Sequence, residues 1–466
     1  MNFTIQHTLI PLEHGYATVD VQIVDGRIAA IAPHLEPWGT LVDGQEKLLL
    51  PGFINAHTHS SEMWQRGRIE PLPLELWLAE LYNVPPLDPQ QIYLSALGTA
   101  VETLLSGGTT VVDHLVLIPD RALETIEAAV RGYREVGIRA FIGPLVHDEP
   151  LAAGIPTQGR PPLATPAPME TDAAIALLAE IIQRFHRPDE GISIMASPTG
   201  PQLCTEALFK GFIALSDRYQ LCRHTHLLET KMQKILADEK YGCSAVAYLE
   251  RVGFLDAATS LAHSVWLDEA DIAILARTRS TVVHNPLSNL RLGSGIAPVL
   301  NYLAAGVNVT FGCDGSSSND AQDLLEVIKI GSLLHNITDP EYRNWIPPRQ
   351  AVQMAALGGA QGLGWADQIG SLTVGKQADL VLYDLTSLSL LPRTDPLGLL
   401  VLGRPTQAVD SVWVKGQQVV AAGQMVTVDV ADLRQQFLTW SQQQHEYSSS
   451  LRQQFEPRYR TVLTLP

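Results

Sequence analysis

Short β-branched runs alternate with helical patterns through the middle of the chain, and this alternation limits the fold more than any other feature. Residues 108–115 (GTTVVDHL) have the composition of a strand, and residues 121–137 carry apolar side chains at helical spacing. The succession continues to a predicted strand at 307–314 and a predicted helix at 321–336. About eight strands in about 310 residues fit a closed (β/α)8 barrel. An open doubly wound sheet is the alternative, although no G-x-G-x-x-G motif follows the first strand.

The two ends of the chain are predicted to form a second, smaller domain. Residues 1–50 and 367–430 both contain short β-rich runs broken by glycine. Since similar segments enclose a different middle, the sequence predicts an α/β protein. In it, a TIM-type (β/α)8 barrel at 51–366 carries a small β-sandwich domain built from both ends. The last part, 431–466, starts polar and rich in glutamine, and we expect a helical extension that docks on the protein or forms an oligomer contact.

Charge and hydropathy limit the kinds of molecule that the protein is expected to bind. The 466 residues include 32 Lys and Arg against 49 Asp and Glu, a net charge of −17 that disfavours binding to nucleic acid. We find no run of about 18 apolar residues and no basic start followed by an apolar stretch, so we expect neither a membrane span nor a secretory signal. The 4 cysteines form no C-x-x-C pair, which favours reduced thiols. We therefore expect a cytoplasmic protein that acts on a small molecule.

One segment, 150–169, interrupts the alternation. It is rich in proline, which neither a helix interior nor an inner strand accommodates. It is either a long surface loop or a lid over a pocket, since loops that follow barrel strands line active sites. The sequence leaves both interpretations open.

Histidine pairs mark the ends of two predicted strands. In PGFINAHTHSS, His57 and His59 are two residues apart, and in RHTHLLE, His226 is followed by Glu229. Side chains at i and i+2 of a strand share a face, so His57 and His59 can point toward one metal ion. A carboxylate three residues after a ligating histidine adds a proton carrier to a metal anchor.

Two further strand ends carry polar side chains, His263 in SLAHS and Asp314 in TFGCDG. A single polar residue at a strand end is usually structural. Four such positions at the C-terminal ends of predicted barrel strands are difficult to explain in that way, because catalytic residues lie on this face of a barrel. The sequence therefore predicts a metal-dependent catalytic site there.

These motifs resemble those of the amidohydrolase superfamily, which are metal-dependent hydrolases built on a (β/α)8 barrel. PGFINAHTH resembles the motif of the first barrel strand, HTHLLE that of the fifth, SLAHS that of the sixth and GCDG that of the eighth. The segment VVHNPLSNLRLGSGIAPV is similar to the aminohydrolase and chlorohydrolase branch, which includes 8-oxoguanine deaminase, S-adenosylhomocysteine deaminase and triazine hydrolases. The resemblance runs from about Val42 to Asp384.

The resemblance implies a role for each motif residue. The expected metal ligands are His57, His59, His226 and Asp314. The expected catalytic groups are Glu229, His263 and Asp314. Binuclear members carry a carboxylated lysine at the end of the fourth strand, where GISIMASPTG has none. The resemblance thus implies one divalent metal ion, with Zn²⁺ favoured and Fe²⁺ or Mn²⁺ as alternatives, and a homodimer or higher homo-oligomer.

These parts fit a hydrolytic deaminase. Three neutral imidazoles and one carboxylate leave a bound metal ion cationic enough to bring the pKa of its water toward about 7. The hydroxide is expected to attack a ring carbon that bears an amino group, while Glu229 protonates the adjacent ring nitrogen and ammonia leaves. The expected substrate is an aromatic nitrogen heterocycle of the purine, pyrimidine, pterin or triazine type.

Two alternatives stay open. The same mononuclear site suits a chlorohydrolase, an N-alkylamino-triazine hydrolase or an amide hydrolase, in which the leaving group differs. A barrel of this kind can also serve as a non-catalytic binding protein, although such relatives usually lose ligands that are all present here.

Several aromatic, imidazole and amide side chains near predicted strand ends are candidates to contact the substrate: Trp64, Trp77, His114, His147, His284 and Asn289. The two tryptophans would stack on a flat heterocycle or pack in the core instead. Each of the three histidines fits a structural role as well as a substrate contact. His224, which shares a face with His226, is expected to support the metal ligands.

Overall fold

Two four-stranded parallel sheets, each in sequence order, form the centre of the protein. The computed structural model describes residues 2–163, 165, 169–441 and 450–465. Within these residues the first sheet contains β6 (Phe53–Thr58), β7 (Gly108–Val116), β8 (Arg139–Leu145) and β9 (Ile192–Ile194). The second contains β10 (Arg223–Leu227), β11 (Thr259–His263), β12 (Thr281–His284) and β13 (Asn308–Phe311).

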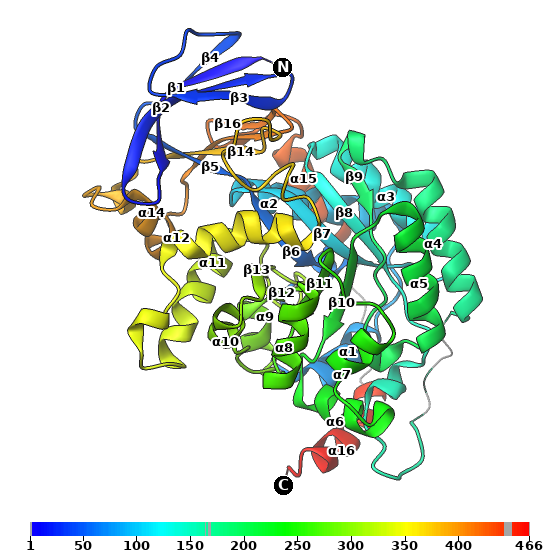
Figure 1. The fold of residues 1–466 in the computed structure, drawn as a ribbon. Coiled ribbons are helices and arrows are strands. Elements are labelled where there is room, and N and C mark those ends of the chain that lie inside the picture. Colours follow the sequence, from blue (N-terminus) through cyan, green and yellow to red (C-terminus); the bar gives the residue numbers. More distant parts are fainter. Residues whose placement is uncertain (1, 164, 166–168, 442–449, 466) are drawn as a thin grey trace.

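The two sheets meet on both sides. Ala196, just after β9, forms a parallel bridge with Arg223 of β10. On the other side, the backbone N–H of Asp314 donates to the carbonyl of His57 at 2.9 Å, which places the end of β13 beside β6. The predicted (β/α)8 barrel is therefore confirmed (Figure 1).

Helices follow the strands and surround the barrel (Figure 1). They include α2 (Pro89–Leu105), α3 (Ala122–Val136), α4 (Thr171–Phe185), α5 (Glu206–Tyr219), α6 (Lys231–Tyr241), α7 (Ala245–Arg251), α8 (Glu269–Thr278), α9 (Pro286–Arg291), α10 (Val299–Ala304) and α11 (Leu324–Leu333). The side chain of Asp88 caps α2. Residues 231–251 form two helices, because Gly242 ends α6 with a φ of 64° and Ser244 caps α7.

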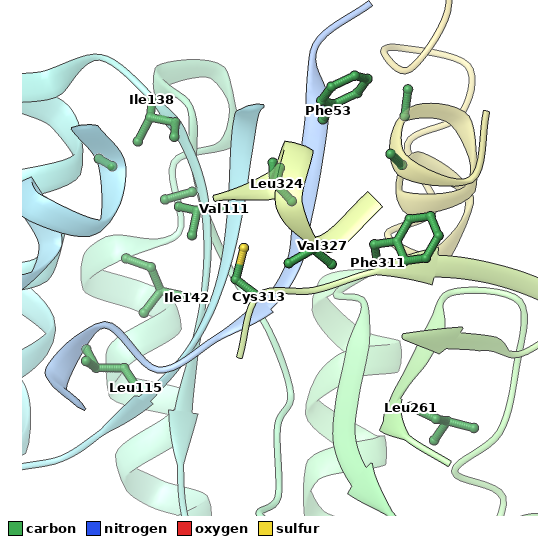
Figure 2. Close-up of a cluster of buried hydrophobic side chains, with 14 of the residues drawn as sticks. Phe53, Val111, Leu115, Ile138, Ile142, Leu261, Phe311, Cys313, Leu324 and Val327 are labelled. Atoms are coloured by element: carbon green, nitrogen blue, oxygen red, sulfur yellow. The ribbon is translucent and has the colours of Figure 1, made fainter. Parts of the chain in front are cut away.

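Side chains alternate between the inside and the outside of the barrel. Val112 of β7 and Val283 of β12 share a small apolar cluster with Phe141 of β8. Their neighbours Val111 and Val282 point the other way, into the large core between strands and helices. Figure 2 shows part of this large core, where side chains of the strands meet those of α11. The alternation fixes which strand residues face the barrel interior.

Strands from both ends of the chain pair in one mixed sheet, in the order β17-β16-β15-β14-β5-β1-β2-β3, with β4 paired to β1. Their bounds are β1 (Phe3–Pro11), β2 (Tyr16–Val24), β3 (Arg27–Ala32), β4 (Thr40–Asp43), β5 (Lys47–Pro51), β14 (Leu380–Asp384), β15 (Val409–Val414), β16 (Gln417–Ala421) and β17 (Gln424–Met425). The ends meet where β5 runs antiparallel to β14. The predicted pairing is confirmed, while the domain boundaries stay a prediction.

The last part of the chain folds back as α15 (Val430–Ser441) and α16 (Ser450–Val462). Helix α16 packs on α1 (Leu74–Leu81), which belongs to the segment after β6. In the proline-rich stretch, residues 151–154 form a 3-10 helix, whereas 164 and 166–168, like 442–449 of the extension, lie outside the described residues. Its role as loop or lid stays a prediction. In the described ranges, every helix is too short or too polar to span a bilayer.

Candidate active site

Three histidines and an aspartate meet at the C-terminal end of the barrel. His57 lies in β6 with His59 just after it, His226 lies in β10, and Asp314 follows β13. The Nε2 atoms of His59 and His226 are 3.2 Å apart. Oδ1 of Asp314 lies 3.3 Å from Nε2 of His57 and 3.5 Å from Nε2 of His59. The structure thus brings the four predicted ligand residues together.

Backbone carbonyls fix the tautomers of two of these imidazoles. Nδ1 of His59 donates to the carbonyl of His114, and Nδ1 of His226 donates to the carbonyl of Thr199, each at 2.6 Å. A carbonyl only accepts, so Nε2 of each neutral imidazole carries a lone pair. Two lone pairs that face each other at 3.2 Å repel unless a cation lies between them. This arrangement of donors fits a metal ion.

The spacing of the donor atoms fits a tetrahedral ion. Ligands that lie about 2.0–2.1 Å from tetrahedral zinc are about 3.3 Å from one another, and the three distances here are 3.2, 3.3 and 3.5 Å. Behind them, Nε2 of His224 is 2.8 Å from Nδ1 of His57, and its own Nδ1 is 2.7 Å from Oγ of Ser260. With Nδ1 of His57 directed at His224, its buried Nε2 is left on the side of Asp314 and can face the ion.

Burial and charge favour the protonation states that a metal ion needs. Desolvation lowers the pKa of His57 to about 4 and holds that of His226 well below its usual range. Burial alone would raise the pKa of Asp314, but the hydrogen bond and charge of His57 hold it well below its usual range. His59 differs: burial lowers its pKa, and the carboxylates of Glu62 and Asp314 outweigh this and raise it. His57 and His226 are therefore neutral and Asp314 is anionic, as a metal ion requires, whereas a bound ion has to displace the proton that the neighbouring carboxylates favour on His59.

His114 of β7 lies beside these ligands. Its Nε2 donates to the carbonyl of Ser197 at 3.0 Å, while its buried Nδ1 has no hydrogen-bond partner among the described residues. One nitrogen of His114 also lies within 4.8 Å of nitrogens of His57 and His226. The sequence predicts a substrate contact for His114, and the structure adds a second interpretation, as a further imidazole at the metal.

Glu229 and His263 lie next to the ligand set. Nε2 of His263 is 3.6 Å from Oε2 of Glu229 and 3.9 Å from Oδ2 of Asp314. The other carboxylate oxygen of Glu229 accepts a hydrogen bond from Oγ of Ser294 at 2.9 Å. Burial raises the pKa of Glu229, so this carboxyl holds a proton more readily than an exposed glutamate. A proton carrier therefore lies beside the candidate metal ligands.

Asn289 contacts a catalytic candidate. Its Oδ1 is 2.9 Å from Nδ1 of His263, so Nδ1 donates and Nε2 of His263 is left facing Glu229. The amide of α9 thus orients the imidazole. The predicted contact of Asn289 with substrate stays a prediction.

The two predicted tryptophans pack against apolar side chains. The indole of Trp64 lies against Phe437 of α15, with ring centroids 5.0 Å apart. Trp77 is 3% exposed and belongs to an apolar cluster with Leu292. The contacts of both side chains agree with the core-packing alternative.

Two more of the predicted histidines contact groups other than the metal candidates. His284 follows the inward-facing Val283, so its ring points out of the barrel, where its Nε2 is 3.3 Å from Nε2 of His335. Nδ1 of His147 contacts the carbonyl of Glu149 at 2.8 Å. The predicted contacts of both side chains with substrate stay predictions.

Glu62 is a buried carboxyl near the site that the motifs do not single out. It comes three residues after His59 and is 5% exposed. Burial raises its pKa to about 7, with His59 lowering it and Asp314 raising it further. Oγ of Ser317 donates to its Oε2 at 2.6 Å. Gly315 leaves space for this oxygen, since a Cβ there would lie 1.7 Å from it.

The chain is similar to known proteins over most of its length. Residues 48–419 match the model of the amidohydrolase family. The chain is 34% identical to a 5-methylthioadenosine/S-adenosylhomocysteine deaminase of Desulforudis audaxviator, over 90% of this chain and 94% of the relative. It is 32% identical to a 5'-deoxyadenosine deaminase of Methanothermobacter thermautotrophicus, over 89% of this chain and 92% of the relative.

Solved structures share the fold. An adenosine deaminase from Xanthomonas campestris with bound zinc matches with a TM-score of 0.85 at 27% identity, over 94% of this chain and 97% of that one. An atrazine chlorohydrolase from Arthrobacter aurescens complexed with zinc matches with a TM-score of 0.85 at 26% identity, over 94% and 99%. Because the family match spans most of the sequence and the same barrel carries the histidine and aspartate motifs, this chain belongs to the amidohydrolase family.

Proposed function

We propose that the protein is a metal-dependent hydrolytic deaminase that replaces the amino group of an adenine-type ring with oxygen and releases ammonia. The observation that carries this proposal is the placement of Glu229. Its buried carboxyl has a raised pKa and lies 3.6 Å from His263, next to the candidate metal ligands. Hydroxide adds more readily to an amino-bearing ring carbon when the adjacent ring nitrogen is protonated, and Glu229 is suited to supply that proton.

A single divalent cation would be held by His57, His59, His226 and Asp314, with His114 as a further candidate. We propose zinc, because the donor spacing fits it and two similar proteins were solved with zinc. Fe²⁺ and Mn²⁺ stay alternatives. When bound, such a cation supplies a water molecule whose pKa is lowered to about 7.

The residues of the chain divide the proton transfers among them. Oδ2 of Asp314, which lies 3.9 Å from Nε2 of His263, accepts a proton from the attacking water. Glu229 donates a proton to the ring nitrogen next to the reacting carbon, so negative charge does not build up on the ring. The proton on Asp314 then passes to the leaving amino group, and the new hydroxyl group returns a proton to Glu229. One water is consumed and one ammonia is released.

The names of the relatives support an adenine nucleoside as substrate. They are deaminases of 5-methylthioadenosine and S-adenosylhomocysteine, of 5'-deoxyadenosine and of adenosine. The second candidate is a triazine hydrolase, because the atrazine chlorohydrolase has the same fold. The two candidates differ in the leaving group, which is ammonia in the first and chloride or an alkylamine in the second.

The test is product analysis with zinc-loaded protein. The substrates are adenosine, 5'-deoxyadenosine, 5-methylthioadenosine and S-adenosylhomocysteine, with guanine, an amino-triazine and atrazine for contrast. We expect ammonia from at least one adenine nucleoside. Chloride from atrazine, without ammonia from any adenine compound, would contradict the proposal and favour the second candidate.

The role of Glu229 has its own test. We predict that Glu229→Gln lowers kcat by about 10²–10⁴-fold, since an amide cannot donate the carboxyl proton, while zinc content measured by mass spectrometry stays the same. The control is Glu127→Gln on the exposed face of α3, which should change neither quantity. Full turnover in the Glu229→Gln variant with zinc bound would refute the role.

Two further expectations stay proposals. We propose a homodimer or higher homo-oligomer, which light scattering in solution measures, and a cytoplasmic location.

A further inference from the structure

Glu229 lies in the turn between β10 and α6, which we call the Glu229 turn. Another buried glutamate, from a distant part of the chain, contacts this turn. Glu75 lies in the first turn of α1 and is 6% exposed. Its Oε1 is 2.5 Å from Oγ1 of Thr230, the residue directly after Glu229. The reaction described above does not use Glu75, so its burial needs a separate explanation.

The hydrogen bonds around Thr230 have a defined direction. Thr230 caps α6, and its Oγ1 accepts from the backbone N–H of Gln233 at 3.3 Å. Its hydroxyl proton is therefore directed to Glu75, which accepts it. The side chain of Gln233 completes the connection to Glu229, because its Oε1 accepts from the backbone N–H of Glu229 at 2.7 Å. Glu75 is thus linked to the backbone of Glu229 through two intermediate residues, Thr230 and Gln233.

The turn that carries Glu229 needs support. Leu228, just before it, has a φ of 43°, in the left-handed region that leucine rarely adopts. A residue held in this region persists only when its surroundings determine it. The contacts of Thr230 and Gln233 are polar, buried and adjacent to this residue.

We propose that Glu75 is a positioning residue for Glu229, acting through Thr230 and Gln233. The inference rests on the proposed function of Glu229 as the proton carrier. Glu75 accepts the Thr230 hydroxyl, which keeps Thr230 at the start of α6. The resulting geometry holds the backbone of Glu229 so that its carboxyl stays 3.6 Å from His263.

Apolar packing of helix α1 fixes the position of Glu75. On α1, Leu76 and Ala79 share an apolar cluster with Met232 of α6 and Phe455 of α16. Helix α1 is therefore held between α6, which starts at the Glu229 turn, and the C-terminal helix. This places the carboxyl of Glu75 at a fixed distance from Thr230.

The contact does not depend on the charge of Glu75. Burial raises the pKa of this carboxyl to about 7, with Thr230 lowering it and Glu229 raising it. A carboxylic acid still accepts through its carbonyl oxygen, so the protonated and ionised forms both serve. The amide oxygen of a glutamine can do the same.

The experiment compares matched variants in the zinc-loaded, full-length protein. We expect Glu75→Ala and Thr230→Val to lower kcat for ammonia release by about 10–100-fold, as small misplacements of a catalytic group do, with KM changed by less than about 2-fold and zinc retained. Glu75→Gln and Thr230→Ser keep the hydrogen bond and should stay within about 3-fold of the wild type. The control is Glu80→Gln, on the same helix but paired with Arg452.

A second measurement does not require turnover. Amide hydrogen exchange at Glu229 and Gln233 should be faster in Glu75→Ala and Thr230→Val than in the wild type, and unchanged in the Gln and Ser variants. Unchanged exchange and kcat in Glu75→Ala would overturn the inference, as would an equal loss of kcat in Glu75→Gln. If the wild type releases no ammonia, the proposed function fails, and the exchange data alone decide whether Glu75 holds the turn. If Glu75→Ala does not fold, the Thr230 pair of variants decides.

Discussion

At the scale of single residues, the carboxyl of Glu75 has a consequence for stability. Its folded-state pKa is about 7 instead of 4.5, mainly because of burial. Between these pH values the unfolded chain has released this proton while the folded chain keeps it, so this group makes the free energy of unfolding fall as pH rises. At about 1.4 kcal/mol per pH unit, the loss is on the order of 3 kcal/mol and is complete above about pH 7.

This leads to a prediction with a defined sign. Glu75→Gln cannot ionise, so we expect it to be more stable than the wild type at pH 8, by about 1–3 kcal/mol, and close to the wild type at pH 4.5. Urea unfolding at the two pH values measures the difference, and all other titrating groups are common to both proteins. A difference of equal size at both pH values would show that the carboxyl does not titrate as described.

The residues that the sequence predicts well are those whose chemistry depends on local spacing. His57 and His59 are two positions apart on one strand, so the strand period alone places both on one face. His284 shows the limit of this reasoning: it also ends a strand, but Val283 occupies the inward position. The sequence does not single out Glu62, because the residues that surround its carboxyl, Ser317 and Gly315, lie about 250 residues further along the chain.

At the scale of elements, the C-terminal helix α16 braces the segment after β6. Phe455 is 1% exposed and lies in an apolar cluster with Leu76, Ala79 and Met232. Arg452 of the same helix pairs with Glu80 of α1 at 3.7 Å. The polar composition of the extension predicts a helix, but it does not tell which surface the helix covers, because few of its residues are apolar.

The prediction for this element concerns packing. We expect Phe455→Ala to lower the free energy of unfolding by about 3–5 kcal/mol, because a buried aromatic ring is replaced by a cavity. The control is Leu438→Ala on α15, a residue 51% exposed, which should change it by less than about 0.5 kcal/mol. Urea unfolding measures both. Equal stability of Phe455→Ala and the wild type would mean that α16 is dispensable for the fold.

At the scale of the whole molecule, the sequence predicts the barrel because the spacing of apolar residues distinguishes the strand from the helix in each β-α unit. It also predicts that the two ends share a sheet, since both show the same short strands. It does not predict how the sheet meets the barrel, because that depends on contacts between distant residues. Arg139 of β8 and Asp379, just before β14, form such a contact, with Nη2 3.0 Å from Oδ1 and both side chains at most 2% exposed.

A buried ion pair of this kind can be dissected by removing one charge and then the other. We expect Asp379→Asn to lower the free energy of unfolding by about 3–5 kcal/mol, because Arg139 is left as a buried charge without its counter-ion. Adding Arg139→Met should recover most of this loss, since the uncompensated charge is then gone. Glu124→Gln, which breaks the exposed pair with Arg121, is the control and should give no measurable change.

The same cycle tests whether barrel and terminal sheet unfold as one unit. Phe53 of β6 and Tyr383 of β14 belong to one core, with ring centroids 6.3 Å apart, so apolar packing crosses the same boundary as the ion pair. We therefore expect a single urea transition that shifts as a whole in Asp379→Asn. A second transition that appears only in this variant would show that the sheet can detach while the barrel stays folded, and the ion pair would then join two separable domains instead of one cooperative structure.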